Sequence, residues 1–176
     1  MIDKNKLEQS KRNFEKYLRE GLIKEERNEA AFLTYLKNSY LSLKVAEKLM
    51  KDELKPYLWV VVCSYYSMFY MANAVLLKIG YKTGDRIVHR VTFDALIVLV
   101  LDKIKRELLE EYEKIKEDAL EIASIKAEDL IKNYEYELGK RSRFQYEMSE
   151  EIKEAKAKTS FIRAREFVFE MRKLLK

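Results

Sequence analysis

The sequence predicts an all-α protein in which charged, amphipathic helices surround one apolar helix. Only 4 Gly and 1 Pro occur in 176 residues, which leaves little turn chemistry. Charged residues make up 37% of the chain, and the Lys and Glu that dominate them are good helix formers. With 48% hydrophobic residues, a chain of this length fits a single domain, residues 1–176, with one core.

The apolar helix is expected between Pro56 and Gly80, a stretch without charge until Lys78. About 20 uncharged residues could cross a bilayer, and a helix that is apolar on all sides belongs either to a membrane or to a core. The serines, asparagine and tyrosines within it, and its densely charged flanks, favour a buried core helix. Pro56 suits a first helical turn and Gly80 a C-terminal stop, so one helix is expected to fill the interval.

Two amphipathic helices are expected before this stretch. Asp3 can cap a first helix that runs to about Glu20 and ends at Gly21. A second helix is expected from Glu26 to Lys51. Its apolar residues at helical spacing are Phe32, Leu36, Leu43, Leu49 and Met50.

A turn is expected directly after the apolar helix, in the segment YKTGD (81–85). Gly84 could adopt a positive φ there, and Thr83 or Asp85 could cap the next helix. Short loops of this kind usually join antiparallel neighbours.

The segment from residue 86 to 138 contains no Gly or Pro, yet a single helix of that length would span about 80 Å, too long for a compact domain. Breaks are therefore expected near 101–105 and near 123–127. A narrow apolar stripe should pack on one side: Leu101, Ile104, Leu108, Tyr112 and Ile115. Gly139 should end a helix, and a last helix should begin after Ser149. Its buried face should hold Ile152, Phe161, Ala164, Val168 and Met171.

The composition also indicates a compartment. A single cysteine, Cys63, excludes an internal disulfide framework and fits a reducing environment. The first 25 residues lack the apolar segment of a signal peptide, so we expect a cytoplasmic protein. The net charge of +5 is compatible with nucleic acid binding without requiring it. Enrichment in Lys and Glu is also typical of heat-adapted proteins.

Several classes of site are disfavoured by the residue inventory. One His and one Cys cannot assemble a zinc or iron ligand set, and clustered glutamates are most simply a solvated helix face, so we expect no metal. There is no Gly-rich phosphate loop, and we expect no cofactor. A Ser or Cys nucleophile would need His89 as its base, and Cys63 lies in an apolar run that hides it.

Cations and aromatic residues alternate in the segment GKRSRFQYEMSE (139–150). This mixture suits a phosphate backbone and a stacked base, and it makes the segment a candidate binding site for RNA or a nucleotide. The alternative is a loop whose arginines pair with nearby glutamates and whose aromatic rings fill the end of the bundle. The candidate binding residues are Lys140, Arg141, Arg143, Phe144 and Tyr146.

The order of four segments resembles the HEPN superfamily, small helical domains of prokaryotic toxin systems and nucleotide-linked proteins. The segments are YYSMFYMANAVLLKIGYKT (65–83), His89, RSRFQYEMSE (141–150) and AREFVFEMRKLL (164–175). The resemblance is greatest to the mostly archaeal and bacterial branch called UPF0332, and it begins at about Leu18. It implies an antiparallel up-and-down bundle of four core helices plus one or two more, residues 1–25 being an accessory helix. It also implies a homodimer with the motif Arg facing a cleft at the interface.

The chain departs from the pattern that the resemblance implies for active ribonucleases. Arg141 matches the motif Arg, but Tyr146, Glu147 and Met148 stand where His is expected. Metal-independent RNA cleavage needs an acid and a base that work near neutral pH, and a Tyr with a pKa of about 10 is a poor substitute for His. The catalytic candidates, if cleavage persists, are Arg141, Tyr146 and His89; His89 could instead bond locally at a helix start.

Three hypotheses follow. The leading one is a HEPN-type module that binds RNA or a nucleotide and has lost the catalytic half of the motif. The second is a metal-independent endoribonuclease of a toxin–antitoxin type system. The third, implied by the resemblance, is a partner of a minimal nucleotidyltransferase, with Tyr146 as acceptor of a nucleotide. Polar side chains of the apolar helix must find partners, so we expect some of Tyr65, Tyr66, Tyr70 and Asn73 to line the cleft or the dimer seam.

Overall fold

The computed structural model describes residues 2–132 and 150–176, with side chains for residues 2–122 and 153–176. These residues form an all-α bundle with one small two-stranded sheet, as the sequence predicts for the fold class. The elements are α1 (Lys4–Arg19), β1 (Ile23–Glu25), α2 (Glu29–Met50), α3 (Tyr57–Lys78), β2 (Tyr81–Thr83), α4 (Val88–Leu99), α5 (Arg106–Lys132) and α7 (Glu150–Lys173).

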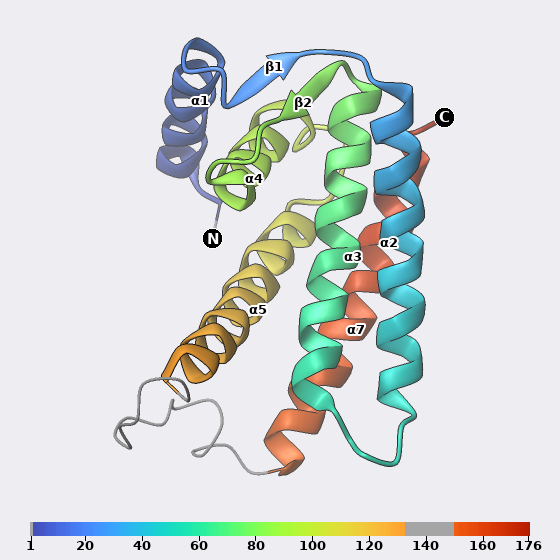
Figure 1. The fold of residues 1–176 in the computed structure, drawn as a ribbon. Coiled ribbons are helices and arrows are strands. Elements are labelled where there is room, and N and C mark those ends of the chain that lie inside the picture. The colour runs from blue at the N-terminus through green and yellow to red at the C-terminus, as the bar shows by residue number, and fades with distance from the viewer. Residues whose placement is uncertain (1, 133–149) are drawn as a thin grey trace.

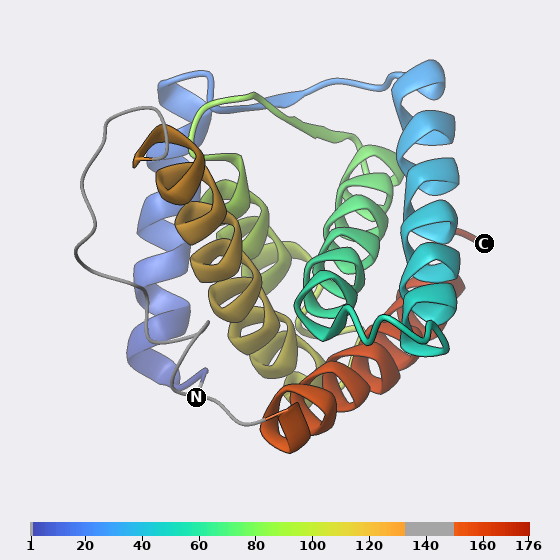
Figure 2. The ribbon, with the colours of Figure 1, turned by 60° about the horizontal axis from the view of Figure 1, so that its bottom comes forward.

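Helix α3 is the centre of the bundle and packs against α2, α7, α5 and α4 (Figure 1). The helices form two groups, and α3 belongs to one of them. Helices α2, α3 and α7 lie together on one side, and α1, α4 and α5 lie on the other, as the second view also shows (Figure 2). Helix α3 is long and apolar enough to cross a membrane, but 83% of its most apolar window is buried inside the bundle. It is therefore the core helix.

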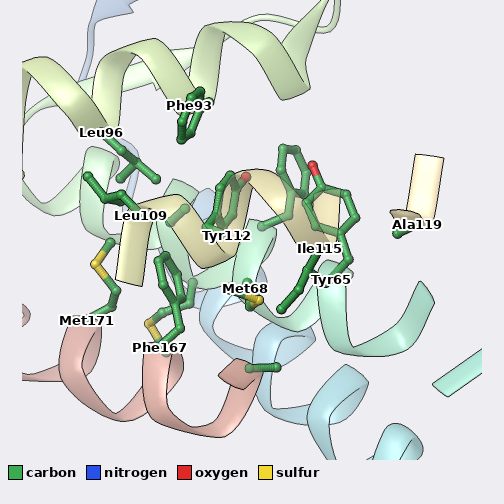
Figure 3. Packing of buried hydrophobic residues seen from close by; sticks show 14 of the residues in the cluster. Tyr65, Met68, Phe93, Leu96, Leu109, Tyr112, Ile115, Ala119, Phe167 and Met171 are labelled. Carbon is green, nitrogen blue, oxygen red and sulfur yellow. The ribbon is translucent and has the colours of Figure 1, made fainter. Parts of the chain in front are cut away.

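A column of aromatic rings joins the two groups in the core (Figure 3). The ring of Phe93 on α4 stacks on Tyr112 of α5 at a centroid distance of 6.0 Å, and Tyr112 stacks on Phe167 of α7 at 5.3 Å. Stacked aromatic pairs contribute about 0.5–1.5 kcal/mol each beyond the area that they bury. The column thus fixes α4 and α7 against opposite sides of α5.

The predicted start of α1 is confirmed, whereas that of α2 is displaced. The Asp3 carboxylate accepts a hydrogen bond from the Lys6 backbone N–H at 2.7 Å, and Gly21 follows the helix with φ at 69°. Helix α2 begins at Glu29, because the side chain of Asn28 caps it by accepting from the Ala31 N–H at 2.9 Å. Before the cap, residues 23–25 pair antiparallel with residues 81–83, and the Glu26 N–H donates to the Gly80 carbonyl. The sequence did not indicate this sheet, since three-residue strands are too short to show an alternating pattern.

The expectations for the turn after α3 were wrong in two respects. Gly80, with φ at 98°, has the positive φ that was expected at Gly84. A Cβ at Gly84 would instead lie 3.4 Å from the Leu22 carbonyl oxygen. Neither proposed capping residue caps α4, whose N-cap is Ile87 in a left-handed conformation without a side-chain bond. The Thr83 hydroxyl instead donates a hydrogen bond to the Asn73 side chain.

Of the two predicted breaks, the first is confirmed and the second is wrong. Helix α4 ends at Leu99 and α5 begins at Arg106, but α5 then runs without interruption to Lys132. Residues 123–127 contain no Gly or Pro and are mostly good helix formers, so nothing there ends the helix. The predicted stop at Gly139 lies outside the described residues.

The last helix begins where it was predicted, at Glu150. Ala164, Val168 and Met171 are buried, and Phe161 is partly buried, as expected for its inner face. The side chain of Ile152 lies outside the described ones. On α5, the expected stripe is buried at Leu108, Tyr112 and Ile115.

Candidate anion-binding site

The five basic and aromatic residues that the sequence singles out, Lys140, Arg141, Arg143, Phe144 and Tyr146, lie outside the described residues. The binding loop therefore stays a prediction. His89 and the polar residues of α3 are described, and they lead to a different part of the surface.

Asn73 lies inside the core of a single chain, 1% exposed, and not at an exposed surface. Its amide nitrogen donates to the Phe69 carbonyl at 2.9 Å, and its amide oxygen accepts from the Thr83 hydroxyl at 2.7 Å. Thr92 on α4 lies within hydrogen-bond distance of the same amide. Asn73 therefore ties β2 and α4 to the core helix.

The tyrosines of α3 differ in their exposure. Tyr65 is fully buried, while Tyr66 and Tyr70 are partly buried. Tyr70 stacks on Tyr35 of α2, with ring centroids 6.1 Å apart. Two of them contact His89: the Tyr65 hydroxyl lies 2.7 Å from Nδ1 of His89, and the Tyr66 ring lies edge-on to the imidazole, with centroids 6.2 Å apart.

His89 stands in the first turn of α4 against aromatic rings of α3. The His89 and Phe69 ring centroids lie 4.7 Å apart. Burial lowers the pKa of His89, and the nearby positive charge of Lys116 lowers it further, so the imidazole is neutral at pH 7. Burial raises the pKa of Tyr65, which therefore keeps its proton. Depending on the tautomer, Tyr65 donates to Nδ1 or accepts from it, and the contact fixes the ring in either case.

A pocket of about 430 Å³ opens beside His89, between α1, α4 and α5. This volume is within the range of small-molecule sites, roughly 300–1,000 Å³. Eight of the eleven lining residues are polar or charged, although most of the surface that the pocket exposes is apolar. The lining residues are Lys6, Gln9, Asn13, Ile87, His89, Arg90, Phe93, Asp94, Glu113, Lys116 and Leu120.

Two lysines of this pocket share one aromatic ring. The Nζ atoms of Lys6 and Lys116 lie 5.2 and 4.7 Å from the centroid of the Phe93 ring. Lys6 also forms an ion pair with Glu113, at 3.4 Å. Lys116 has no carboxylate within ion-pair distance in the part of the chain that the structure describes. Burial lowers the pKa of Lys116, and the more distant charges of Glu113 and other carboxylates only partly offset this.

Asp94 is a buried carboxylate at the pocket, and it accepts three hydrogen bonds. Its carboxylate, 2% exposed, accepts hydrogen bonds from Ser10 at 2.8 Å and from Asn13 and Tyr17 at 2.9 Å. Burial, and then the charge of Asp94, raise the pKa of Tyr17 to about 12. All three donors belong to α1, so Asp94 holds α1 in place as one wall of the pocket.

The N-terminus of α4 adds to the positive potential of this pocket. Its N-cap, Ile87, offers no side-chain acceptor to the first N–H groups of the helix. Ile87, His89 and Arg90 all line the pocket, so the positive end of the helix dipole lies at its edge. Arg90 forms no ion pair within the described ranges, 2–122 and 153–176.

The chemistry that this arrangement supports is the binding of an anion. Three cations line the pocket, and its two carboxylates are engaged, Asp94 by three hydrogen bonds and Glu113 by Lys6. Lys116 and Arg90 remain for a ligand, together with the fixed imidazole of His89. Sequence reasoning found only His89. Asp94 could have been found, because it is an isolated carboxylate within the apolar run VTFDALIVLVL (91–101). Nothing in the sequence distinguishes Lys116 from the many other charged residues of α5.

A second hollow, of about 530 Å³, lies between α2 and α7 on the other side of the molecule. It is mainly apolar and includes exposed large side chains, Phe169 at 61% and Ile162 at 51% exposure. We call it the α2–α7 groove. Its lining residues are Tyr40, Leu43, Ile162, Arg165, Glu166, Val168, Phe169 and Arg172.

Comparisons of this chain with protein-family models, with curated proteins and with solved structures gave no significant match. The geometry of the pocket is therefore the main support for a functional proposal.

Proposed function

We propose that this protein is a HEPN-type module that binds RNA or a nucleotide through a phosphate group. The observation that carries the proposal is the pocket between α1, α4 and α5, where Lys116 and Arg90 stand beside His89 without carboxylate partners among the described residues. Lysine and arginine form charge-assisted hydrogen bonds with phosphate oxygens, which are about twice as strong as neutral ones. The basic and aromatic loop of the sequence resemblance, Lys140 to Tyr146, is proposed as a second contact for the same ligand.

The test is a binding titration with fluorescently labelled RNA and labelled ATP at several salt concentrations. Because phosphate contacts release counterions, we expect the affinity for RNA to fall as salt rises. Lys116→Ala should weaken binding about 10-fold, the loss expected for one charge-assisted contact. Lys114→Ala is the matched control, since Lys114 is an exposed residue of the same helix that does not line the pocket. Absence of binding to both ligands, or equal effects of both substitutions, would contradict the proposal.

A second candidate function, a metal-independent ribonuclease of a toxin–antitoxin type system, is favoured by one observation. The only histidine of the chain lines the pocket beside two cations, and its pKa is lowered, so it can accept a proton at neutral pH. Cleavage of a defined RNA in EDTA that is lost in both His89→Gln and Arg141→Ala would establish this function. Binding without cleavage would leave the protein as a binding module.

We also propose that the protein is a homodimer, and that a second copy covers the α2–α7 groove. The groove combines exposed apolar side chains with charges of both signs, Arg165 and Arg172 beside Glu166. Such a surface can pair with itself across a two-fold axis, because each cation can meet the carboxylate of the other copy. Light scattering over a range of protein concentrations tests this, and a monomeric mass throughout would contradict it.

A further inference from the structure

We propose that Tyr65 and Tyr112 hold the His89 imidazole in the tautomer that is protonated at Nε2, so that His89 offers its ligand a hydrogen-bond donor. Tyr65 and Tyr112 are then positioning residues that act through His89. The role toward the ligand rests on the proposed function, whereas the state of the ring is a property of the free protein. The two candidate functions differ at this point, because binding uses a donor and a ribonuclease requires a base.

The three side chains come from α3, α4 and α5 and meet where these helices pack together. Tyr65 lies between the other two: its hydroxyl is 2.7 Å from Nδ1 of His89, and its ring centroid is 5.8 Å from that of Tyr112. Figure 3 shows the hydroxyl groups of Tyr65 and Tyr112 on the same side of the core. The two hydroxyls interact, because the Tyr112 hydroxyl adds to the effect of burial in raising the pKa of Tyr65.

The Tyr112 hydroxyl sets the direction of the hydrogen bonds. Tyr112 is fully buried, and its hydroxyl has no hydrogen-bond partner of standard geometry among the described residues. The group with which it interacts is the Tyr65 hydroxyl. A buried O–H needs an acceptor, and the Tyr65 oxygen is the acceptor that the described core places beside it.

Only one direction gives every buried proton of this chain of groups an acceptor. If Tyr112 donates to Tyr65 and Tyr65 donates to Nδ1 of His89, both hydroxyl protons are bonded, and the single proton of the neutral ring lies on Nε2. If Nδ1 instead carries the proton and donates to Tyr65, then Tyr65 donates to Tyr112, and the Tyr112 proton has no acceptor. A buried donor without an acceptor is rarer than an unused lone pair, so the first arrangement is favoured.

The environment keeps all three groups neutral. Burial lowers the pKa of His89, and the charge of Lys116 lowers it further, so the ring carries one proton and not two at pH 7. Burial raises the pKa of Tyr112, which therefore keeps its proton. A neutral imidazole has one N–H and one acceptor nitrogen, so the position of the proton decides which of them the ligand meets.

The N–H of His89 is available to a ligand in the pocket. Nδ1 is turned to Tyr65 of α3, and the bonding directions of the two ring nitrogens diverge, which leaves Nε2 for the pocket that His89 lines. Nε2 has no hydrogen-bond partner among the described residues. It can donate to an oxygen of an anion held by Arg90 and Lys116, but a protonated Nε2 has no lone pair with which to take a proton from a ribose hydroxyl.

The state of the ring can be measured directly, because His89 is the only histidine of the chain. Protein labelled with ¹⁵N-histidine is examined at pH 7 by long-range ¹H–¹⁵N correlation spectroscopy, in which protonated and unprotonated ring nitrogens have clearly different shifts. We expect Nε2 to be protonated and Nδ1 not. Tyr65→Phe should move the two shifts toward each other, and Tyr112→Phe should do so to a smaller extent. Tyr66→Phe is the matched control and should leave them unchanged, since the Tyr66 ring touches the imidazole without a hydrogen bond to it.

A second experiment tests the donor. His89→Gln retains an N–H group and is not a base, whereas His89→Leu has neither property. In titrations with the labelled RNA, His89→Gln should bind within about 2-fold of the wild type, and His89→Leu should bind about 5-fold more weakly, the effect of one hydrogen bond. Circular dichroism and thermal unfolding of each variant separate loss of the ligand contact from loss of the fold.

The outcomes distinguish this inference from the proposed function. A ring protonated at Nδ1, or shifts that stay unchanged in folded Tyr65→Phe and Tyr112→Phe, overturns the inference even if RNA is bound. Equal weakening in His89→Gln and His89→Leu overturns the donor role, and RNA cleavage in EDTA that His89→Gln abolishes would make His89 a base and overturn it as well. Absence of binding to RNA and ATP overturns the proposed function together with the ligand role of His89, whereas the spectrum still decides the tautomer.

Discussion

The two sides of the molecule offer hollows of similar size that are lined by different residues. Eight of the eleven residues that line the pocket between α1, α4 and α5, of about 430 Å³, are charged or polar, whereas five of the eight that line the α2–α7 groove, of about 530 Å³, are hydrophobic. The first set offers cations to a small anion, whereas exposed apolar side chains are suited to contact with protein. The comparison shows that volume alone does not identify a binding site for a phosphate.

The largest effect is expected at Asp94. Asp94→Ala would leave the polar groups of Ser10, Asn13 and Tyr17 without their acceptor, and buried unsatisfied groups cost about 1–3 kcal/mol each. We expect the free energy of unfolding to fall by about 3 kcal/mol in urea titrations, and RNA binding to weaken as the α1 wall loosens. Asp102→Ala, at an exposed position, is the control. Unchanged stability would mean that α1 is held by its apolar contacts alone.

A smaller and opposite effect on stability is expected at Lys116. Because burial disfavours its charge and no carboxylate pairs with it among the described residues, Lys116→Met should unfold at a slightly higher temperature than the wild type while binding RNA about 10-fold more weakly. Higher stability together with weaker binding would distinguish Lys116 from Asp94, whose replacement is expected to reduce both. A variant that is both less stable and weaker in binding would make Lys116 a structural residue instead.

The pH dependence tests the same side of the molecule. The folded-state pKa of His89 lies below its unfolded value, so the unfolded chain binds more protons as the pH falls. His89 therefore contributes stability that is present above about pH 6.5 and is lost as the pH falls through the lower folded-state pKa. The titratable groups that face His89 are Tyr65 and Tyr66 from α3 and Lys116 from α5. Thermal unfolding should show a smaller loss at acidic pH in His89→Gln; an identical pH profile would contradict this.

The smallest effect on stability is expected in the α2–α7 groove. Phe169 is 61% exposed, so Phe169→Glu should change the unfolding free energy of the single chain by less than about 0.5 kcal/mol. If a second copy covers the groove, the same substitution should shift the mass measured by light scattering from dimer to monomer. Leu54→Glu, 88% exposed and outside the groove, should leave the mass unchanged.

The sequence predicts elements that depend on local pattern better than contacts between distant segments. The apolar run of α3, the cap at Asp3 and the start of α7 are encoded in neighbouring residues, and they are confirmed. The break near 123–127 was inferred from a length limit, and the helix passes through it. The sheet escaped prediction because each strand has three residues and its partner lies almost 60 positions away.

The candidate pocket could not be predicted from the sequence either, because it depends on contacts between distant segments. Lys6, Arg90 and Lys116 belong to three helices, and each stands among many similar charges in the sequence. Only the fold shows which cations lack a partner. Asp94 is the exception, because a lone carboxylate in an apolar run must be buried with hydrogen-bond donors, although the sequence does not say that α1 supplies them.

The attachment of α1 has a consequence for the order in which the chain folds during synthesis. Ser10 and Asp94 are 84 residues apart, and Ile2 and Glu110 are 108 apart. At about 5–20 residues per second, α1 leaves the ribosome several seconds before its acceptor on α4. Helix α1 therefore cannot form its contacts with Asp94 and Glu110 until those residues have left the ribosome, so the pocket between α1, α4 and α5 is completed only after most of the chain has been synthesised.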